Sequence, residues 1–534
     1  FPGSPEAWKA GHYTADSDQP IRDGYANKSW EKQKRYNLLL DFYLNYNKDL
    51  DAINSSLDVT AGYSWQKFAN KGSNWSKVYA PGQSFDGYQR DATYYYSSPY
   101  QLVSFFGRVQ YGLMGKYLLT ATVRRDGSSR FSKDNRWGTF PSVALAWRVI
   151  DENFMEGARS VMNDFKIRGT WGITGQQDLG STFDMLFPYL PIYDVSTNMG
   201  QRPPFAGGAD LWLVTPQKYN STLKWEETTT WNVGVDFAFL NNRINGSFDY
   251  YLRKTKDLLT NTTYAGGSNL APDGPMNIGD LQNTGFEFNI VTRPVVTKIF
   301  QWTSSLNVAW NKNEITHLAQ GADIPTGDIG NQVNVQLQRE GQPAFSYFVY
   351  EQVYNEDGTP AEGVFVDRNG DGQITEDDKY IFRSRDPKVT ANWQNTINYK
   401  NWDFGIVMRG SFGNWMYNKN MADNCFGGDA QTLPLGNILS EDYCYIFNHA
   451  KSTALLCSDY FVQNASYVRC DNITVGYTWE NLLQNNLRLR LFGAVQNPFV
   501  ITKYKGNDPE VFSGIDSNAY PRPVTFTLGL VATF

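Results

Sequence analysis

Apolar and polar residues alternate along much of the chain with a period of two. In the segment LDVTAGYSW at 57–65, every second residue is apolar, and the residues between them are Asp, Thr, Gly and Ser. Successive side chains of a β-strand point to opposite faces, so each such segment predicts a strand with one apolar face and one polar face. The same pattern recurs at 143–149, 231–239, 306–310 and 402–408.

These segments number about fifteen, and short turns and long polar loops join them alternately. Short turns are expected at 113–117 and 239–245, and two of the long outer loops at 316–388 and 418–466. Short turns at one end and long loops at the other are typical of outer-membrane barrels. The pattern therefore predicts an all-β protein, a transmembrane antiparallel β-barrel whose long loops form a binding surface. A soluble sandwich or lectin-like array is the alternative, although it seldom repeats aromatic residues near strand ends.

The last segment, VTFTLGLVATF at 524–534, predicts a final strand with an apolar row that faces lipid and ends at Phe534. If the order of loops and turns is traced backwards, the first strand, Tyr36–Tyr46, is entered from the long-loop side and residues 1–30 lie outside. Bacterial single-chain barrels usually have an even number of strands, with both ends in the periplasm. We therefore expect this chain to be the C-terminal portion of a larger barrel.

Composition and charge narrow the classes of function. The net charge is −6 and the pI is near 5.4, which argues against a nucleic-acid partner because such proteins usually carry a basic excess. The three histidines, His12, His317 and His449, are isolated in the sequence. No zinc-binding HExxH, nucleophile-elbow, P-loop or dinucleotide motif occurs. The sequence does not predict an enzyme.

Several stretches are similar to the SusC/RagA family of TonB-dependent outer-membrane transporters of the Bacteroidetes. They follow the order of the family over nearly the whole chain, and they include RRDGSSRFSKDNRWGTFPSVALAWRVIDENFM at 124–155, KIRGTWGITGQQ at 166–177, FVDRNGDGQITEDDKY at 365–380, NASYVRCDNITVGYTW at 464–479, VQNPFVITKYKGNDPEV at 495–511 and YPRPVTFTLGLVATF at 520–534.

The resemblance implies a 22-stranded barrel with an internal plug, a SusD-like surface lipoprotein as a lid, and energy supplied by TonB from the periplasm. No plug domain precedes Phe1, so we expect another chain or segment to carry the plug and the first strands, and TonB to act through it. The implied function is import of large nutrients, oligosaccharides or oligopeptides, across the outer membrane of a Gram-negative bacterium. An adhesin or a passive porin is the alternative.

One segment of the 316–388 loop has the pattern of a calcium-binding loop. The residues DRNGDGQITEDD at 367–378 match D-x-[DN]-x-[DN]-G with an acidic residue at the twelfth position. Oxygens at the first, third and fifth positions can converge on one hard cation, and Gly372 permits the sharp turn. The predicted calcium ligands are Asp367, Asn369, Asp371, the backbone carbonyl of Gln373, and Asp378. A solvated acidic turn is the alternative.

The four cysteines, Cys425, Cys444, Cys457 and Cys470, all lie in or just after the 418–466 loop. An exported protein permits disulfides, and four cysteines can pair in three ways. At least one disulfide that staples this loop is expected, without a choice among the pairings. The loop segment 183–212 carries aromatic residues that could stack on sugar rings or cover peptide side chains, namely Phe187, Tyr189, Tyr193, Phe205 and Trp212. Which residues bind substrate stays open.

Overall fold

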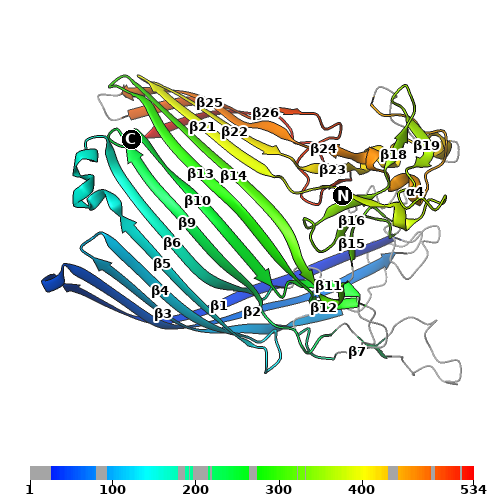
Figure 1. Cartoon of the computed structure of the whole chain (residues 1–534), viewed down its shortest axis with the longest axis horizontal. Coiled ribbons are helices and arrows are strands. Elements are labelled where there is room, and N and C mark those ends of the chain that lie inside the picture. The colour runs from blue at the N-terminus through cyan, green and yellow to red at the C-terminus, as the bar shows by residue number, and fades with distance from the viewer. Residues whose placement is uncertain are drawn as a thin grey trace.

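The alternating segments form one large antiparallel sheet. The computed structural model describes residues 26–79, 93–178, 187–191, 193–195, 214–216, 219–263, 273–321, 323–330, 332–430, 443–482, 487–517 and 520–533. Within these residues, fifteen strands pair with their neighbours in chain order and curve into a barrel wall (Figure 1). The strands are β1 (Ala26–Leu50), β2 (Ser55–Tyr79), β3 (Thr93–Leu113), β4 (Tyr117–Ser128), β5 (Trp137–Arg148), β6 (Met162–Gln176), β9 (Glu226–Phe239), β10 (Ile244–Lys256), β13 (Gly279–Val296), β14 (Phe300–Leu318), β21 (Val389–Tyr399), β22 (Trp402–Phe412), β25 (Tyr467–Asn481), β26 (Leu487–Thr502) and β28 (Thr525–Thr533). The predicted all-β class and the count of about fifteen strands are confirmed.

Short connections lie at one end of the wall. The β9–β10 turn occupies 240–243, and Asn241 and Asn242 have φ of 57° and 59°, a left-handed conformation that Asn adopts more easily than most residues. The connections at this end also include three 3-10 helices, η1 (Asp51–Ile53), η2 (Val149–Asp151) and η3 (Asn153–Ala158). None of the helices in the described residues is long and apolar enough to cross a membrane.

The first strand is longer than the sequence pattern predicts. β1 begins at Ala26, not at Tyr36, and its ladder with β2 runs from Ala26 opposite Tyr79 to Leu50 opposite Ser55. The predicted first strand, Tyr36–Tyr46, is therefore too short at both ends. The reason is that ladder hydrogen bonds use backbone groups, so a hairpin can continue beyond the point where apolar alternation ends.

The two faces of the wall differ as the alternation predicts. One face carries large apolar side chains that stay exposed, such as Val233 (58%), Leu145 (57%) and Phe248 (44%). The other face carries charged residues from neighbouring strands that pair with one another, such as Arg168 and Asp249. Outward apolar and inward polar faces are those of a membrane barrel.

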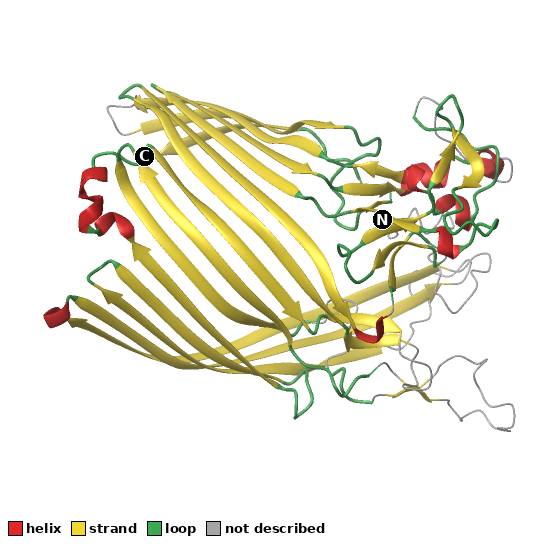
Figure 2. Cartoon of the chain, viewed as in Figure 1, coloured by secondary structure: helices red, strands yellow, loops and turns green. Residues whose placement is uncertain are grey.

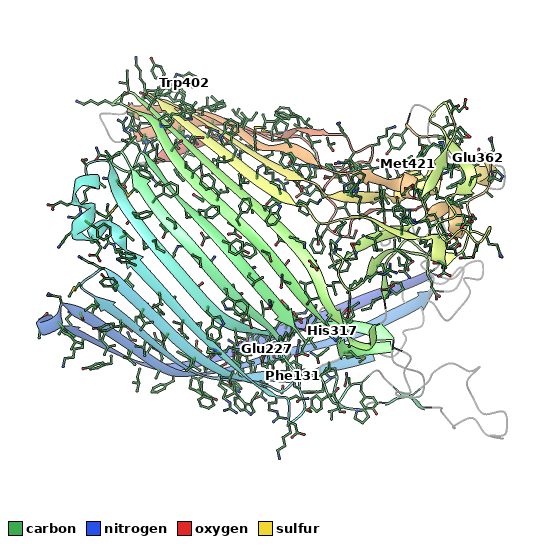
Figure 3. All side chains as sticks on the ribbon, viewed as in Figure 1. Phe131, Glu227, His317, Glu362, Trp402 and Met421 are labelled. Carbon is green, nitrogen blue, oxygen red and sulfur yellow. The ribbon has the colours of Figure 1, made fainter. Side chains whose placement is uncertain are left out.

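Aromatic side chains gather near both ends of the outward face. At the short-turn end, the Trp402 ring lies 4.9 Å from Tyr477, and Tyr117 stacks on Trp147 at 6.5 Å. Figure 3 places Trp402 at the end of the wall opposite Met421 and Glu362, which lie in the outer loops. At the loop end, Trp310 stacks on Phe286 with ring centroids 5.6 Å apart. Such belts are typical of the two membrane interfaces.

The long connections at the other end carry additional short elements (Figure 2). The short strands are β7 (Tyr193–Val195), β8 (Val214–Pro216), β11 (Leu259–Thr263), β12 (Asp273–Asn277), β15 (Ile324–Asp328), β16 (Asn334–Gln338), β17 (Ser346–Val349), β18 (Gln352–Tyr354), β19 (Pro360–Phe365), β20 (Tyr380–Ser384), β23 (Trp415–Asn418), β24 (Val462–Asn464) and β27 (Ile515–Asp516). The helices are α2 (Lys419–Asn424), α3 (Gly427–Ala430), α4 (Thr453–Leu456), η5 (Ala319–Gly321), η6 (Glu376–Asp378) and η7 (Asp459–Phe461).

The two longest outer connections fold together instead of forming separate loops. Their buried residues make one hydrophobic core that combines the β14–β21 connection, the β22–β25 connection and Ile515 of the last loop. Tyr347 is fully buried in this core, and its hydroxyl donates toward the carbonyl oxygens of Gly514 (2.6 Å) and Trp415 (2.9 Å). We call this assembly, formed by the described residues within 319–388, 413–466 and 515–516, the outer cap.

Candidate functional site: a polar pocket inside the wall

Paired charges line the inward face from strand to strand. Arg168 on β6 donates to Asp249 on β10 (2.7 Å) and to Asp236 on β9 (3.1 Å). Further along the sheet, Arg490 on β26 donates to both carboxylate oxygens of Asp403 on β22, at 2.9 and 2.6 Å. Each charge is balanced by a partner on a nearby strand, which lowers the cost of placing these groups in the partly enclosed interior.

The loop after β26 folds back onto this inward face. We call its residues 505–514 the inner loop. Asp508 accepts a 2.6 Å hydrogen bond from Arg469 on β25, and both side chains are more than nine-tenths buried. Glu510 pairs with Arg409 on β22. Arg522, just before β28, lies 3.0 Å from Asp508 and 3.0 Å from Glu510, so it joins both carboxylates of the inner loop in one ion-pair network.

A pocket of about 980 Å³ lies between the inner loop and the wall, and we call it the inner pocket. Strands β10, β13, β14, β21 and β22 supply one side, and the inner loop and the residues just before β21 supply the other. Its polar and charged lining residues are Ser247, Asp249, Glu287, Asn289, Asn307, Arg385, Asp386, Thr390, Asn392, Arg409, Ser411, Asn414, Tyr467, Glu510 and Arg522.

The three arginines of the inner pocket are all neutralised locally. Arg409 and Arg522 share Glu510, and Arg385 lies 3.3 Å from Asp386. Burial raises the pKa of Asp386, and its pairing with Arg385 opposes that rise. The pocket therefore offers many hydrogen-bond donors and acceptors without a strong excess of either charge.

One aromatic ring projects openly into the inner pocket. Phe512 of the inner loop is 93% exposed. The Arg385 guanidinium lies 5.2 Å from the Phe512 ring and 3.7 Å from the Phe345 ring, a cation–π arrangement that positions the arginine between them. An exposed aromatic face beside planar polar groups can stack on a sugar ring or on a peptide group.

The side chains of the inner pocket are arranged in a way that suits the binding of a ligand. Among the described residues, no group of three or more His, Cys, Asp and Glu side chains is placed to hold a metal. Two histidines pair with single carboxylates in the outer loops, His317 with Glu340 at 3.0 Å and His449 with Glu362 at 2.5 Å. His12 lies outside the described residues. What the inner pocket presents is a set of polar contacts for a ligand.

The predicted calcium loop forms a chain of tight turns closed by its own hydrogen bonds. Asp367 accepts from the amides of Gly370 (2.6 Å) and Gly372 (2.8 Å). Asn369 and Asp371 each accept from the amide two residues further on, at 2.9 and 2.8 Å. Gly370 and Gly372 have φ of 75° and 79°, so the sharp turns predicted from the glycines are present.

The twelfth residue of that loop is a buried anchor. Asp378 is fully buried and accepts from the amides of Thr375 (2.7 Å) and Arg368 (2.9 Å). These backbone hydrogen bonds, that of Thr375 above all, lower the pKa of the Asp378 carboxyl. The carboxylate and amide oxygens suit a hard cation, but the Asn369 amide group donates to Asp371 at 3.1 Å and the loop is satisfied by its own backbone. Calcium therefore stays a prediction from the sequence pattern, together with Gln373 as a carbonyl ligand.

The four cysteines are buried and are free thiols in the structure. Cys425, Cys444 and Cys457 belong to the core of the outer cap, whereas Cys470 lies on the barrel strand β25. A hydrogen bond to Cys444, followed by burial, raises the pKa of the Cys425 thiol. Of the three disulfide pairings that the sequence left open, this contact favours the one that joins Cys425 to Cys444. The disulfide itself stays a prediction.

The aromatic segment 183–212 is only partly described. The rings of Phe187 and Tyr189 pack edge to face with centroids 6.3 Å apart, so each covers the other. Phe205 and Trp212 lie outside the described residues, as does Phe534 of the predicted lipid-facing row.

The sequence did not single out the inner pocket, because its residues come from segments more than 250 positions apart. In the sequence, only the polar residues of each alternating strand could have indicated the inner pocket.

Comparisons with known proteins agree with this architecture. Residues 4–498 match the family model described as "TonB dependent receptor-like, beta-barrel". The chain is 43% identical over 528 residues to TonB-dependent receptor SusC of Bacteroides thetaiotaomicron, which covers 94% of this chain and 50% of that protein. It is 32% identical to TonB-dependent receptor P3 of Formosa agariphila, over 95% of this chain and 53% of the relative. The chain thus spans about half the length of these curated relatives.

Solved structures have the same fold. The structure of the RagAB peptide transporter superposes with a TM-score of 0.81 at 20% identity, over 95% of this chain and 56% of that one. The outer-membrane transporter YddB of Escherichia coli superposes with a TM-score of 0.51 at 10% identity, over 94% of this chain and 55% of that one. The SusC/RagA resemblance and the location in the outer membrane are confirmed by these similarities. The chain belongs to the family of TonB-dependent receptor-like β-barrels.

Proposed function

We propose that this chain forms the barrel wall and substrate pocket of a TonB-dependent importer of large nutrients, of the kind that pairs a SusC-like barrel with a SusD-like lipoprotein. The observation that carries the proposal is the inner pocket of about 980 Å³, which lies on the polar inward face next to the inner loop. A soluble substrate that enters from the outer cap would meet this face first. Nothing in the comparisons supports the alternative of an adhesin or a passive porin.

The chemistry of the inner pocket favours a hydroxyl-rich oligosaccharide over an oligopeptide. Its arginines are paired with carboxylates, and its walls carry asparagine, serine and threonine side chains. Sugar hydroxyls donate and accept hydrogen bonds at once, so they suit a surface with both kinds of group. The exposed Phe512 ring can stack on a sugar face.

A SusD-like lipoprotein is the partner proposed for the outer cap. Three large apolar side chains of the cap stay exposed on neighbouring segments, Tyr354 (50%), Val364 (48%) and Ile374 (41%). A surface of this kind suits a partner that covers it during substrate capture. Co-purification of the lipoprotein should weaken when Val364 and Ile374 are replaced together by Ser, and retention of the wild-type amount would contradict this assignment.

The energy-coupling parts are proposed to lie outside this chain. β1 and β28 each pair on one side only among the described residues, and the curated relatives are about twice as long as the matched region. A further segment or chain that carries the plug and the first strands would satisfy both edges, and TonB would act through that plug.

Uptake by intact cells tests the proposal. Labelled oligosaccharides and oligopeptides are offered separately, with and without an uncoupler. We expect uncoupler-sensitive oligosaccharide uptake, and we expect Phe512→Ala to reduce it roughly 3- to 10-fold through loss of stacking. Tyr520→Ala is the matched control, since Tyr520 is 87% exposed in the same connection but does not line the inner pocket.

Each remaining outcome has a separate meaning. Uptake that persists with the uncoupler would support the passive porin and overturn the proposal. Uncoupler-sensitive uptake of oligopeptides alone would keep the importer and overturn the choice of substrate. An equal effect of both substitutions would remove Phe512 from the substrate path.

A further inference from the structure

A row of polar side chains crosses the strand side of the inner pocket. The register of the sheet places five lining residues opposite one another on neighbouring strands, namely Ser247 of β10, Asn289 of β13, Asn307 of β14, Asn392 of β21 and Arg409 of β22. Three successive strands thus carry an asparagine at the same level. We call Asn289, Asn307 and Asn392 the asparagine row.

The asparagine row belongs to the inward face of the wall. The Phe286 and Trp310 rings stack on the outward face, and Asn289 and Asn307 each lie three positions from one of these rings. Because side chains alternate along a strand, this odd separation puts both asparagines on the opposite face. Asn392 is directly opposite Asn307 on the neighbouring strand and so projects to the same side. The row therefore faces the pocket and not the lipid.

The amide groups of the row keep hydrogen-bonding capacity for a ligand. The side-chain amide of Asn289 donates to the side-chain oxygen of Asn307. An asparagine side chain has two N–H donors and two acceptor lone pairs, so this one contact leaves most of the capacity of the pair unused. The Asn392 side chain is exposed and has no hydrogen-bond partner within the part of the chain that the structure describes. The row suits an uncharged ligand that both donates and accepts.

The spacing of the row distinguishes between the two substrate classes. Directly opposite residues on neighbouring strands lie about 5 Å apart. In an extended peptide, the side chains on one side recur about every 6.7 Å, because they are two residues apart. An unbranched oligosaccharide repeats its hydroxyl groups once per ring, a distance close to the strand spacing. A sugar chain that crosses the strands can therefore meet one polar side chain per unit, whereas an extended peptide falls out of step.

We propose that an unbranched oligosaccharide binds across the strands, with successive sugar units on the asparagine row. This inference rests on the proposed import function and adds the residues that select the substrate and the direction in which it lies. Phe512 of the inner loop also lines the pocket, so its exposed ring can stack on a unit that the row holds. Ser247 and Arg409 extend the row to five strands, enough for about five sugar units.

Direct binding to the purified native assembly tests the inference. Titration calorimetry in detergent measures the affinity for unbranched neutral gluco-, manno- and xylo-oligosaccharides, each as a series of increasing length that begins with the monosaccharide. For the series that binds, we expect the affinity to rise up to about five units, one for each strand, and then to level off. Binding by none of the series, or an affinity that does not change with length, would overturn the proposal.

Asn392→Ala separates the row from general damage to the pocket. The loss of one neutral hydrogen-bonding side chain should weaken the binding of long oligosaccharides about 3- to 10-fold. The disaccharide of the same series should lose less affinity, because it can occupy other positions of the row. Asn289→Ala/Asn307→Ala, which removes both members of the bonded pair, should weaken binding at every length. An equal loss for the disaccharide and the long chains in Asn392→Ala would contradict one unit per strand.

The matched control is Asn398→Ala. Asn398 lies on the same strand and the same face as Asn392, is exposed, and has no side-chain hydrogen-bond partner among the described residues. It does not line the inner pocket, so its replacement should leave the affinity unchanged. Equal losses in the two single variants would overturn the proposal. The change of electrophoretic migration on boiling shows that each variant is folded.

The titrations and the uptake experiment fail in different ways. Uptake that persists with the uncoupler overturns the importer, whatever the titrations show. Uncoupler-sensitive uptake, together with unchanged affinity in Asn392→Ala and in the double variant, keeps the importer and overturns the role of the asparagine row. An affinity that rises with the length of oligopeptides, and not of oligosaccharides, would overturn the sugar as the ligand of the row.

Discussion

Single buried polar residues hold the outer cap together. Tyr347 joins three connections through one hydroxyl, and burial strongly raises its pKa, so it remains a neutral donor. Asp378 does the same within one loop, because its carboxylate accepts backbone amides on both sides of the turn. Loss of the Asp378 carboxylate would leave the amides of Thr375 and Arg368 without this acceptor.

At the scale of single residues, low pH should weaken the loop that Asp378 holds together. Since the folded pKa of Asp378 is lowered, its contribution to stability is complete above the ordinary carboxyl pKa of about 3.9 and is lost as the pH falls through the folded value. We expect the protection of the amides in 367–378, measured as the exchange rate relative to the intrinsic rate at each pH, to fall below about pH 4. Asp378→Asn should lower this protection at neutral pH and weaken its acid dependence. Asp377→Asn, a change at an exposed neighbour, should leave exchange at neutral pH unchanged.

The second residue-scale prediction concerns the cysteines. Oxidation of the native protein should join Cys425 to Cys444, because their thiols share a hydrogen bond in the core of the outer cap. Peptide mapping without reduction would identify the linked peptides. A link that involves Cys470, on the barrel strand β25, would contradict the arrangement of the cap.

At the scale of elements, the inner loop is held by ion pairs that the wall supplies. Arg469 and Asp508 are both more than nine-tenths buried, so removal of one charge leaves the other without compensation. The predicted calcium loop, in contrast, is closed by its own backbone and, apart from the buried Asp378, carries its charges at the surface. The two segments should therefore respond differently to substitution and to ions.

The inner loop should be released by Asp508→Asn. Breaking a buried ion pair usually costs about 3–5 kcal/mol, which should appear as faster amide exchange across 505–514. Asp151→Asn breaks the exposed pair with Arg148, 3.2 Å apart, and should cost less than about 1 kcal/mol. Equal protection of the inner loop in both variants would show that the network does not hold it.

Calcium should order the 367–378 loop if the pattern is functional. We expect calcium to slow proteolysis of this loop and a chelator to restore it, because the ligand oxygens would be drawn to one ion. Asp367→Asn/Asp371→Asn should abolish the protection. Glu376→Gln, outside the predicted ligand set and paired with Lys379, is the control. Protection that is insensitive to both calcium and chelator would leave only a solvated turn.

At the scale of the whole molecule, the sheet formed by the described residues has two edges, β1 and β28, and each offers backbone groups that no described strand pairs. In a bilayer such groups must be paired, because no water is available to bond them. We expect a cysteine pair, one placed at an outward position of β1 and one on the adjoining first-strand segment, to cross-link in the native assembly. Direct cross-linking of β1 to β28 would instead show that these fifteen strands close on themselves.

Alternation was a sound guide to the strands because it reflects a local property, the two-residue repeat of side chains. It placed Trp231, Val233 and Phe404 on the outward face without any knowledge of neighbours. It failed at the start of β1, where Lys28 and Glu31 belong to the hairpin, because backbone pairing continues in polar sequence. The resemblance to the SusC/RagA family could also be recognised in the sequence, because each of its motifs is a continuous stretch of residues.

The β-class, the two faces of each strand, the positions of turns and long loops, and the family could all be predicted from the sequence. That the long loops share one core, and that the inner loop returns to Arg409 and Arg469, became visible only in the folded chain. Strand periodicity is set by covalent geometry within a few residues. Pockets and ion-pair networks arise instead from contacts between segments that are distant in the chain and adjacent only after the sheet has formed.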